Sequence, residues 1–444
     1  MAESALPVNE ENSRDRLVRT IGRWSLAALM VNTMIGASIF GLPAPIAAKL
    51  GKMSPAGYLI AAAGMGIIAA CFAEVASQFR EAGGPYLYAR AAFGRFVGIQ
   101  LGWVSWLSRI SAVSAVANLF VIYLSEFFPG VKAPLTRAAV LILLIGFLAA
   151  VNYRGVSAGN HLSNCFTITK LTLLGFFVVA GLTALVVHPS LRLTPQPVHA
   201  SMGDWFDAVI LMVYAYGGFE AALAASGEAR NPRKDVPIAL LFAMIATTLL
   251  YIAVQYLVIH TIPNAGATTK PVVDSARQFL SPLGVRIVAA GTLVSAYGYM
   301  SANMLHTPRV TFAMAEGGDF PAIFGKVHPR FRTPYLSIVL FALVVIAFSI
   351  GGTFKWNAIL SAVSKLFMYG AVAAALPALR RKRPEGDAFR LPHGMLFGVL
   401  GLVFTGVLVT RMRWPEIIVM SVTAGLAYLN WLWARQAPPP PRFL

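Results

Sequence analysis

Charged side chains are scarce in this chain of 444 residues, because Asp, Glu, Lys and Arg together make up 12% of it. Soluble domains usually contain roughly 25% charged residues. Hydrophobic residues make up 57% of the chain, and the mean hydropathy is +0.68. This composition excludes an ordinary soluble domain and predicts a multi-pass protein of the cell (inner) membrane.

Cysteine is nearly absent, with Cys71 and Cys165 as its two examples, and both fall in apolar segments. They are therefore interpreted as small buried side chains, without disulfide, metal or redox chemistry. The seven histidines show no metal-ligand spacing, and no phosphate-binding loop occurs. These absences argue against an enzyme, and we expect no cofactor and no metal site.

Acidic residues are also few, 18 against 36 basic ones, which gives a net charge of +18. The basic residues are spread over short segments between apolar runs, so they indicate membrane topology and no nucleic-acid partner. They are enriched in the segments that would share a side with the N-terminus. Residues 1–20 are polar, and the first apolar run is too long for a signal-peptide core. Both termini are therefore predicted to be cytoplasmic, with no cleaved signal.

The apolar runs predict an all-α membrane protein with twelve transmembrane helices. The expected ranges are 24–49, 54–79, 95–128, 134–152, 157–187, 202–226, 236–262, 283–316, 333–352, 355–380, 392–411 and 413–435. The predicted divisions are a tail over 1–22, five helices over 23–187, five inverted helices over 202–380, an extra pair over 392–435 and a tail over 436–444. Short surface helices are expected at 81–94 and 271–280, and disorder is expected at 438–441.

The first expected helix contains a break between Asn32 and Pro43, because Gly36, Gly41 and Pro43 all weaken helical structure there. A mid-membrane break leaves backbone groups that protein, water or a ligand must satisfy. A second break is predicted between Tyr214 and Glu220. Two broken helices in corresponding halves are typical of transporters with inverted repeats. The alternative is a pair of packing kinks without a ligand.

The two breaks offer complementary chemistry. Free amides near the first would suit a carboxylate, and carbonyls freed at the second would accept hydrogen bonds from an ammonium group. Together they describe a site for the zwitterionic head of an amino acid. The amides belong to Gly36, Ala37 and Ser38, before a half-helix that begins near Phe40; the carbonyls belong to Gly217 and Gly218, and Tyr214 and Tyr216 are placed to close over the ligand.

Three cations fall within the expected spans, namely Arg109, Lys170 and Lys365. A charge inside a membrane is costly, so each is a functional candidate unless its side chain reaches the interface. The plausible buried anions are Glu220 and Glu74, and a structural bond to the loop that follows it is expected for Glu74. The excess of cations favours a substrate with an acidic side chain over polyamines or arginine.

Five motifs make the chain resemble the amino acid-polyamine-organocation (APC) superfamily of transporters, whose members have the LeuT-type 5+5 inverted-repeat fold. The resemblance covers about 23–435. The motifs are Ile35-Gly-Ala-Ser-Ile-Phe-Gly, Glu81-Ala-Gly-Gly-Pro-Tyr-Leu-Tyr, Tyr216-Gly-Gly-Phe-Glu, Gly227-Glu-Ala-Arg-Asn-Pro-Arg-Lys-Asp-Val-Pro and the segment from Arg309 to Pro321. The resemblance implies a secondary transporter that moves an L-amino acid by alternating access.

The resemblance also implies residue roles. The backbone at the first break would hold the substrate carboxylate, the second break and the Met34 carbonyl would hold the amine, and Tyr214 would be an aromatic lid. Ser38 departs from the glycine common at its position. The implied substrate-binding residues are Met34, Ile35, Gly36, Ala37, Ser38, Phe40, Tyr214, Ala215, Gly217, Gly218, Arg109 and Lys365.

Coupling and gating roles follow from the same resemblance. Lys170 matches a lysine that occupies the second sodium position of sodium-coupled relatives, which favours protons or exchange over sodium. Glu220 matches a glutamate linked to gating or proton coupling, and Tyr369 would lie near the cytoplasmic gate. The segment from Ser364 looks like the L-type amino acid branch, where an arginine at the position of Lys365 accompanies anionic substrates in some members.

The sequence therefore favours a proton-coupled symporter for acidic or neutral amino acids. An obligatory amino acid exchanger remains open as a second mechanism, and a membrane sensor that binds without transport remains open as a second class. A channel would show a filter or charged rings, and neither is visible. The exact substrate, the direction of flux and the oligomeric state are left open.

Overall fold

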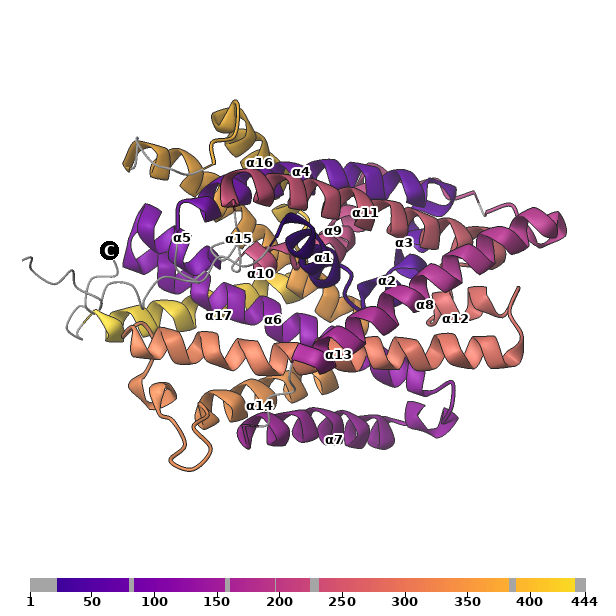
Figure 1. Ribbon diagram of the computed structural model, residues 1–444. Helices are drawn as coiled ribbons and strands as arrows, with labels where there is room; N and C mark the ends of the chain where they lie inside the picture. The colour runs from indigo at the N-terminus through magenta and orange to yellow at the C-terminus, as the bar shows by residue number, and fades with distance from the viewer. Residues whose placement is uncertain are drawn as a thin grey trace, which may run out of the picture.

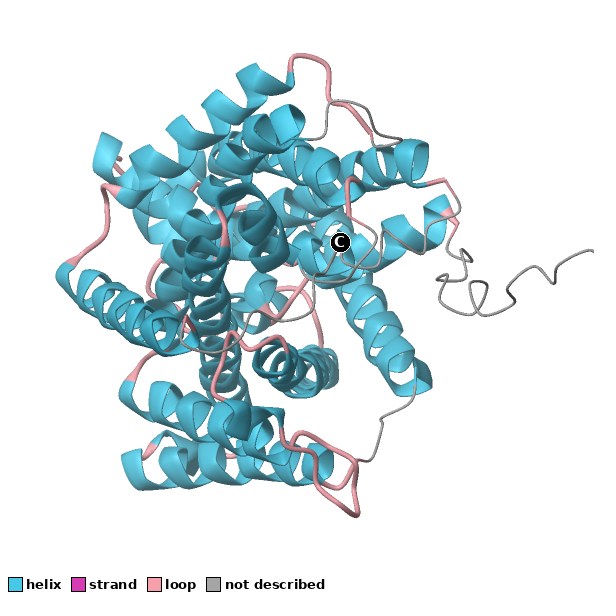
Figure 2. Cartoon of the chain, turned by 90° about the vertical axis from the view of Figure 1, so that its left-hand side faces the viewer, coloured by secondary structure: helices cyan, strands magenta, loops and turns pink. Residues whose placement is uncertain are grey.

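A computed structural model describes residues 22–79, 84–155, 160–195, 197–223, 231–382 and 389–435. These residues form helices joined by loops, with no strand among them (Figure 2). The all-helical prediction is therefore confirmed for the described part of the chain. The expected disorder at 438–441 and most of the N-terminal tail lie outside the described residues.

The helices follow the order of the apolar runs. Their bounds are α1 Arg23–Met34, α2 Ser38–Gly41, α3 Pro43–Leu50, α4 Ser54–Ser77, α5 Gly84–Phe93, α6 Arg95–Leu124, α7 Pro134–Tyr153, α8 Asn160–Val187, α9 Met202–Tyr216, α10 Phe219–Leu223, α11 Pro232–Thr261, α12 Pro271–Ala276, α13 Pro282–Glu316, α14 Tyr335–Gly351, α15 Phe354–Lys382, α16 Gly394–Val409 and α17 Trp414–Ala434.

Ten segments of the described chain are helical, long and apolar enough to cross a membrane. Two further apolar helices, Tyr335–Gly351 and Gly394–Val409, are shorter than 18 residues. They fall where the ninth and eleventh spans are expected. The chain is thus a multi-pass membrane protein, because ten such helices account for most of its length.

Several expected boundaries need correction. Pro43 begins α3 instead of interrupting a helix, because proline at the first helical position loses no intrahelical hydrogen bond. The third expected helix ends at Leu124 and continues as a turn, not as helix to residue 128. The expected helix over 271–280 shrinks to α12, which ends at Ala276, and the one over 81–94 appears as α5.

Figure 1 places the short helices α5 and α12 at opposite ends of the bundle, and we name the two ends after them. The long helices α6 and α13 run between these ends, and α6 packs along α15. The broken helices α1–α3 and α9–α10 pack against α4 and α11. This arrangement buries both breaks in the interior of the bundle.

Glu74 has a structural role, and its described side-chain partners are Arg380 and Leu391; most of the loop expected to bond to it, 80–83, lies outside the described residues. The carboxylate is 1% exposed in the ion pair, and it accepts hydrogen bonds from Arg380 Nε at 2.6 Å and Nη2 at 2.7 Å. The amide of Leu391 also donates to it, at 2.9 Å. Glu74 therefore joins α4 to the C-terminal end of α15 and to the segment before α16.

Candidate functional site

The first break separates α1 from α2 over residues 35–37. The Ile35 amide completes the last turn of α1 by donating to Val31 O, and the Gly36 amide donates to Met34 O at 2.8 Å. Among the described residues, the amides of Ala37 and Ser38 have no acceptor. Of the three amides expected to be free, Gly36 is therefore used by the chain itself, and the next two remain available.

The second break is a turn at Gly217 and Gly218 between α9 and α10. Gly218 has φ +121°, a conformation that glycine adopts without strain. A Cβ atom on Gly218 would overlap the carbonyl oxygen of Thr33, and one on Gly217 would overlap Nζ of Lys365. The absence of side chains at both positions lets α1 and Lys365 approach the backbone of the break directly.

Tyr251 of α11 joins the two breaks. Its hydroxyl lies 2.9 Å from the carbonyl oxygen of Met34 at the end of α1 and 2.9 Å from that of Ala215 near the end of α9. These carbonyls lack intrahelical partners because the helices stop there. On the other side of the first break, the Tyr123 hydroxyl donates to Phe40 O at 2.6 Å. Buried tyrosines thus satisfy part of the freed backbone.

Glu220 is at the centre of a polar cluster beside the second break. One carboxylate oxygen accepts the Gly218 amide at 2.7 Å and the Tyr369 hydroxyl at 3.3 Å. The other lies 3.8 Å from Lys365 Nζ. The ammonium group of Lys365 also lies 5.7 Å from the centre of the Tyr214 ring, as in a cation–π contact. The cluster joins α9, α10 and α15 around the break.

The other two buried cations have different surroundings. Lys170 of α8 donates to both the carbonyl oxygen and the side-chain oxygen of Asn32, at 2.9 and 2.7 Å. Lys170 therefore holds the last turn of α1, three positions before the break begins at Ile35. Arg109 of α6 is partly buried and makes no hydrogen bond or ion pair with any residue that the structure describes.

The structure brings most of the expected site residues together, with Tyr216 as an exception. Its hydroxyl lies within hydrogen-bonding distance of both Tyr58 O and Thr248 Oγ1, so it packs α9 against α4 and α11 and does not lie over the break. Sequence reasoning missed Tyr251 and Tyr299; the Tyr299 ring lies in van der Waals contact with the position that a Cβ on Gly36 would take. No spacing pattern marks either residue, because both belong to helices that are distant in sequence.

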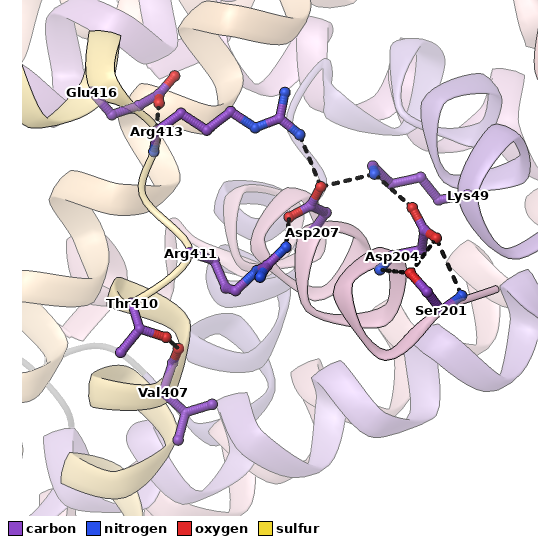
Figure 3. A network of polar contacts seen from close by, with 9 residues as sticks. All are labelled: Lys49, Ser201, Asp204, Asp207, Val407, Thr410, Arg411, Arg413 and Glu416. Carbon is purple, nitrogen blue, oxygen red and sulfur yellow. Dashed lines mark hydrogen bonds and ion pairs between the residues drawn. The ribbon is translucent and has the colours of Figure 1, made fainter.

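A network of ion pairs covers the α12 end of the broken helices (Figure 3). Lys49 at the end of α3 pairs with Asp204 at 3.1 Å and Asp207 at 2.8 Å, both on α9. Asp207 also pairs with Arg413 at 3.0 Å and Arg411 at 3.8 Å, from the turn between α16 and α17.

A second network lies at the α5 end. The Asp319 carboxylate is fully buried and pairs with Arg90 at 2.7 Å and Arg95 at 2.6 Å, and it accepts the hydroxyl of Tyr86. Burial, followed by the Asp319 charge, raises the pKa of the Tyr86 phenol well above its ordinary value. The phenol therefore stays protonated, and the network fixes α5 against α6 and the end of α13.

Met34, Phe40, Tyr214 and Tyr369 are buried at the site, whereas Gly36, Gly218 and Glu220 are partly exposed. Among the described residues, no three His, Cys, Asp or Glu side chains gather as metal ligands would.

Two interrupted helices whose breaks meet inside a bundle of membrane-length helices define a membrane transporter. The sequence profile of the amino acid permease family matches residues 21–435. The chain belongs to that family.

Individual relatives match over most of the chain. A methylthioribose transporter of Bacillus subtilis is 28% identical over 87% of this chain and 86% of its own length. A serine/threonine exchanger of the same species is 28% identical over 85% and 87%, and a branched-chain amino acid permease is 26% identical over 90% of each.

Proposed function

We propose that this protein is a secondary active transporter that moves an L-amino acid across the membrane by alternating access. In this proposal the twelve spans form a LeuT-type arrangement of five helices, five inverted helices and an extra pair. The α5 end and both termini face the cytoplasm, and the α12 end faces outward. The observation that supports it best is the direct approach of Gly218 to Thr33, which brings the two breaks together.

The breaks would bind the substrate head. The Ala37 and Ser38 amides, which have no acceptor among the described residues, would donate to the carboxylate. The carbonyl of Gly217 would accept from the ammonium group, and Tyr214 would cover the ligand. Met34 O already accepts the Gly36 amide and lies 2.9 Å from the Tyr251 hydroxyl. In this proposal the ammonium group would replace that hydroxyl at Met34 O or use the second lone pair of Ala215 O.

The substrate side chain is proposed to be acidic or neutral. The pairing of Lys365 with Glu220 offsets one of the buried positive charges. Arg109 remains without a described partner, and a substrate anion would supply one. One relative is a serine/threonine exchanger and another is a branched-chain amino acid permease, which supports neutral substrates as the other class.

Coupling is proposed to use protons, with Lys170 as the proton carrier. The ammonium group of Lys170 connects α8 to α1 through its bonds to Asn32. A buried lysine is a suitable proton carrier because burial disfavours its charged form. Obligatory exchange is the second candidate mechanism, because one relative is named as an exchanger.

The test is uptake of a panel of labelled amino acids into proteoliposomes, with an imposed inward proton gradient and with or without amino acid inside. Accumulation in empty vesicles that a protonophore abolishes supports symport, whereas uptake only into preloaded vesicles supports exchange. No uptake in either condition contradicts transport of the tested amino acids and favours a sensor or another substrate.

Variants then test the site. Arg109→Ala and Lys365→Ala should change the order of preference between acidic and neutral substrates, and Lys170→Ala should abolish proton-driven accumulation. Lys132→Ala is the matched control, because Lys132 is exposed at the α12 end. An unchanged substrate order in both site variants would contradict the acidic proposal.

A further inference from the structure

Asp207 lies between two groups of cations that belong to different parts of the bundle (Figure 3). Lys49 approaches one side of its carboxylate from α3, and Arg413 and Arg411 approach from the turn between α16 and α17. Asp204, one turn earlier on α9, pairs with Lys49 and bonds to Ser201, and it makes no ion pair with a described residue of the α16–α17 turn. Only one of these two carboxylates therefore connects α9 to the last two helices.

The helices α3 and α9 are joined at this end, and we refer to them as the α3–α9 unit. They pack against each other, and the bonds from Lys49 to Asp204 and Asp207 join them further. Each is the half of a broken helix on the α12 side of its break. Access to the breaks from this end requires these halves to move relative to their surroundings.

We propose that the pairs of Asp207 with Arg413 and Arg411 form a latch that holds the α3–α9 unit closed at the α12 end. The latch must open each time this end admits substrate. This inference rests on the proposed alternating-access function, and it adds a gating role for the turn between α16 and α17.

The strength of the latch suits repeated opening. The side chain of Asp207 is 13% exposed, but those of Arg411 and Arg413 are 42% and 64% exposed. Water can therefore replace the protein partners when the pairs separate, and exposed ion pairs are weak enough to break in each cycle. A fully buried carboxylate such as Asp319, at the other end, would cost far more to separate.

Local structure does not require these pairs. The N-terminus of α9 is already capped by Ser201, whose hydroxyl accepts the Asp204 amide. The turn is held by its own bond from the Arg413 amide to Glu416 at 3.1 Å. The contact between Asp207 and Arg413 therefore stabilises the relative position of two elements that are each locally stable.

The experiment measures how often this end opens. Ala358 is fully buried near the start of α15, the helix that packs against α9. In a full-length background without Cys71 and Cys165, Ala358→Cys reports opening through its rate of reaction with a maleimide. Asp207→Asn should raise that rate roughly three- to tenfold, because neutralising the shared carboxylate removes the pairs that favour the closed state.

Asp204→Asn is the matched control, because it removes a carboxylate on the same helix without touching the α16–α17 turn. Its labelling rate should stay within about twofold of the parent. Thermal stability in detergent identifies a variant that fails to fold, and Arg411→Gln with Arg413→Gln then provides the same test from the other partner.

A labelling rate in Asp207→Asn equal to that of the parent, in folded protein, would overturn the latch. Labelling and transport separate the two proposals. Faster labelling without uptake of any panel amino acid supports the latch and contradicts the proposed substrate class. Uptake with unchanged labelling supports transport and contradicts the latch.

Discussion

Gly218 and Thr33 touch through their backbones: a Cβ atom on Gly218 would overlap the carbonyl oxygen of Thr33. The two residues are 185 positions apart, yet they bring the end of α1 against the turn between α9 and α10. The contact needs both the missing side chain and φ +121° of Gly218. It is the geometric reason that two separate helix breaks lie side by side in the candidate site.

Gly218→Ala should therefore impair the protein severely. Backbone strain of this kind costs roughly 1–3 kcal/mol, and the overlap with Thr33 adds to it by forcing α1 away. We expect loss of uptake and a lower melting temperature in detergent. Gly66→Ala is the control, because a Cβ there meets nothing within 4 Å; equal melting temperatures in the two variants would contradict the contact.

Tyr251→Phe should separate the two breaks without changing their shape. The variant removes the hydroxyl shared by Met34 O and Ala215 O, which should cost roughly 1–3 kcal/mol, since buried acceptors lose their donor. We expect reduced thermal stability and weaker substrate binding. Tyr256→Phe on the same helix should have little effect, because its hydroxyl has no hydrogen bond to a described residue. Similar losses in both variants would show that the shared hydroxyl is unimportant.

Glu220→Gln should remove the negative charge at the second break and keep the hydrogen bond to the Gly218 amide. The amide oxygen can still accept the Gly218 amide, but the charge opposite Lys365 is lost. We expect roughly a tenfold or greater fall in the transport rate and a lower melting temperature, because an unpaired buried cation is costly. Glu220→Ala should lower stability further, since it also leaves the Gly218 amide without its acceptor. The exposed Glu316→Gln serves as a control, and normal uptake by Glu220→Gln would refute the role of the charge.

The ion pairs of Glu126 at the α12 end should make the stability of the folded protein depend on pH. Burial opposes its charged form, but hydrogen bonds and charges from Lys270 and Arg277 prevail, and the pKa of Glu126 is lowered from its ordinary value of 4.5. A lowered pKa in the folded state means that the stabilisation is present above pH 4.5 and is lost as the pH falls through the lower value.

Melting temperatures of the parent and Glu126→Gln, measured from pH 7 downward, test this expectation. The variant should be less stable at pH 7, by about 1 kcal/mol or less, and the difference should shrink below pH 4.5. A difference that stays constant over the whole range would show that the charge of Glu126 does not stabilise the fold.

The sequence predicted the broken helices well because backbone chemistry is local. Gly36, Gly217 and Gly218 weaken a helix wherever it lies, and the apolar runs on either side are long enough to be recognised. Pro43 shows the limit of this reasoning. Proline excludes the interior of a helix but permits its first turn, and only the backbone path reveals which applies.

The partners of the buried charges were beyond the reach of the sequence. It could show that Lys365, Lys170 and Glu74 would need partners, because an isolated charge in an apolar interior is costly. It could not show that these would be Glu220, Asn32 and Arg380.

By itself, then, the sequence determined that this chain is a helical membrane protein with two breaks, since composition and backbone propensity act over short stretches. The tertiary structure alone decided that Tyr251 joins the breaks and that Asp207 joins α9 to the α16–α17 turn. Each of these contacts connects helices far apart in the chain, and their relative placement depends on how all the helices pack together.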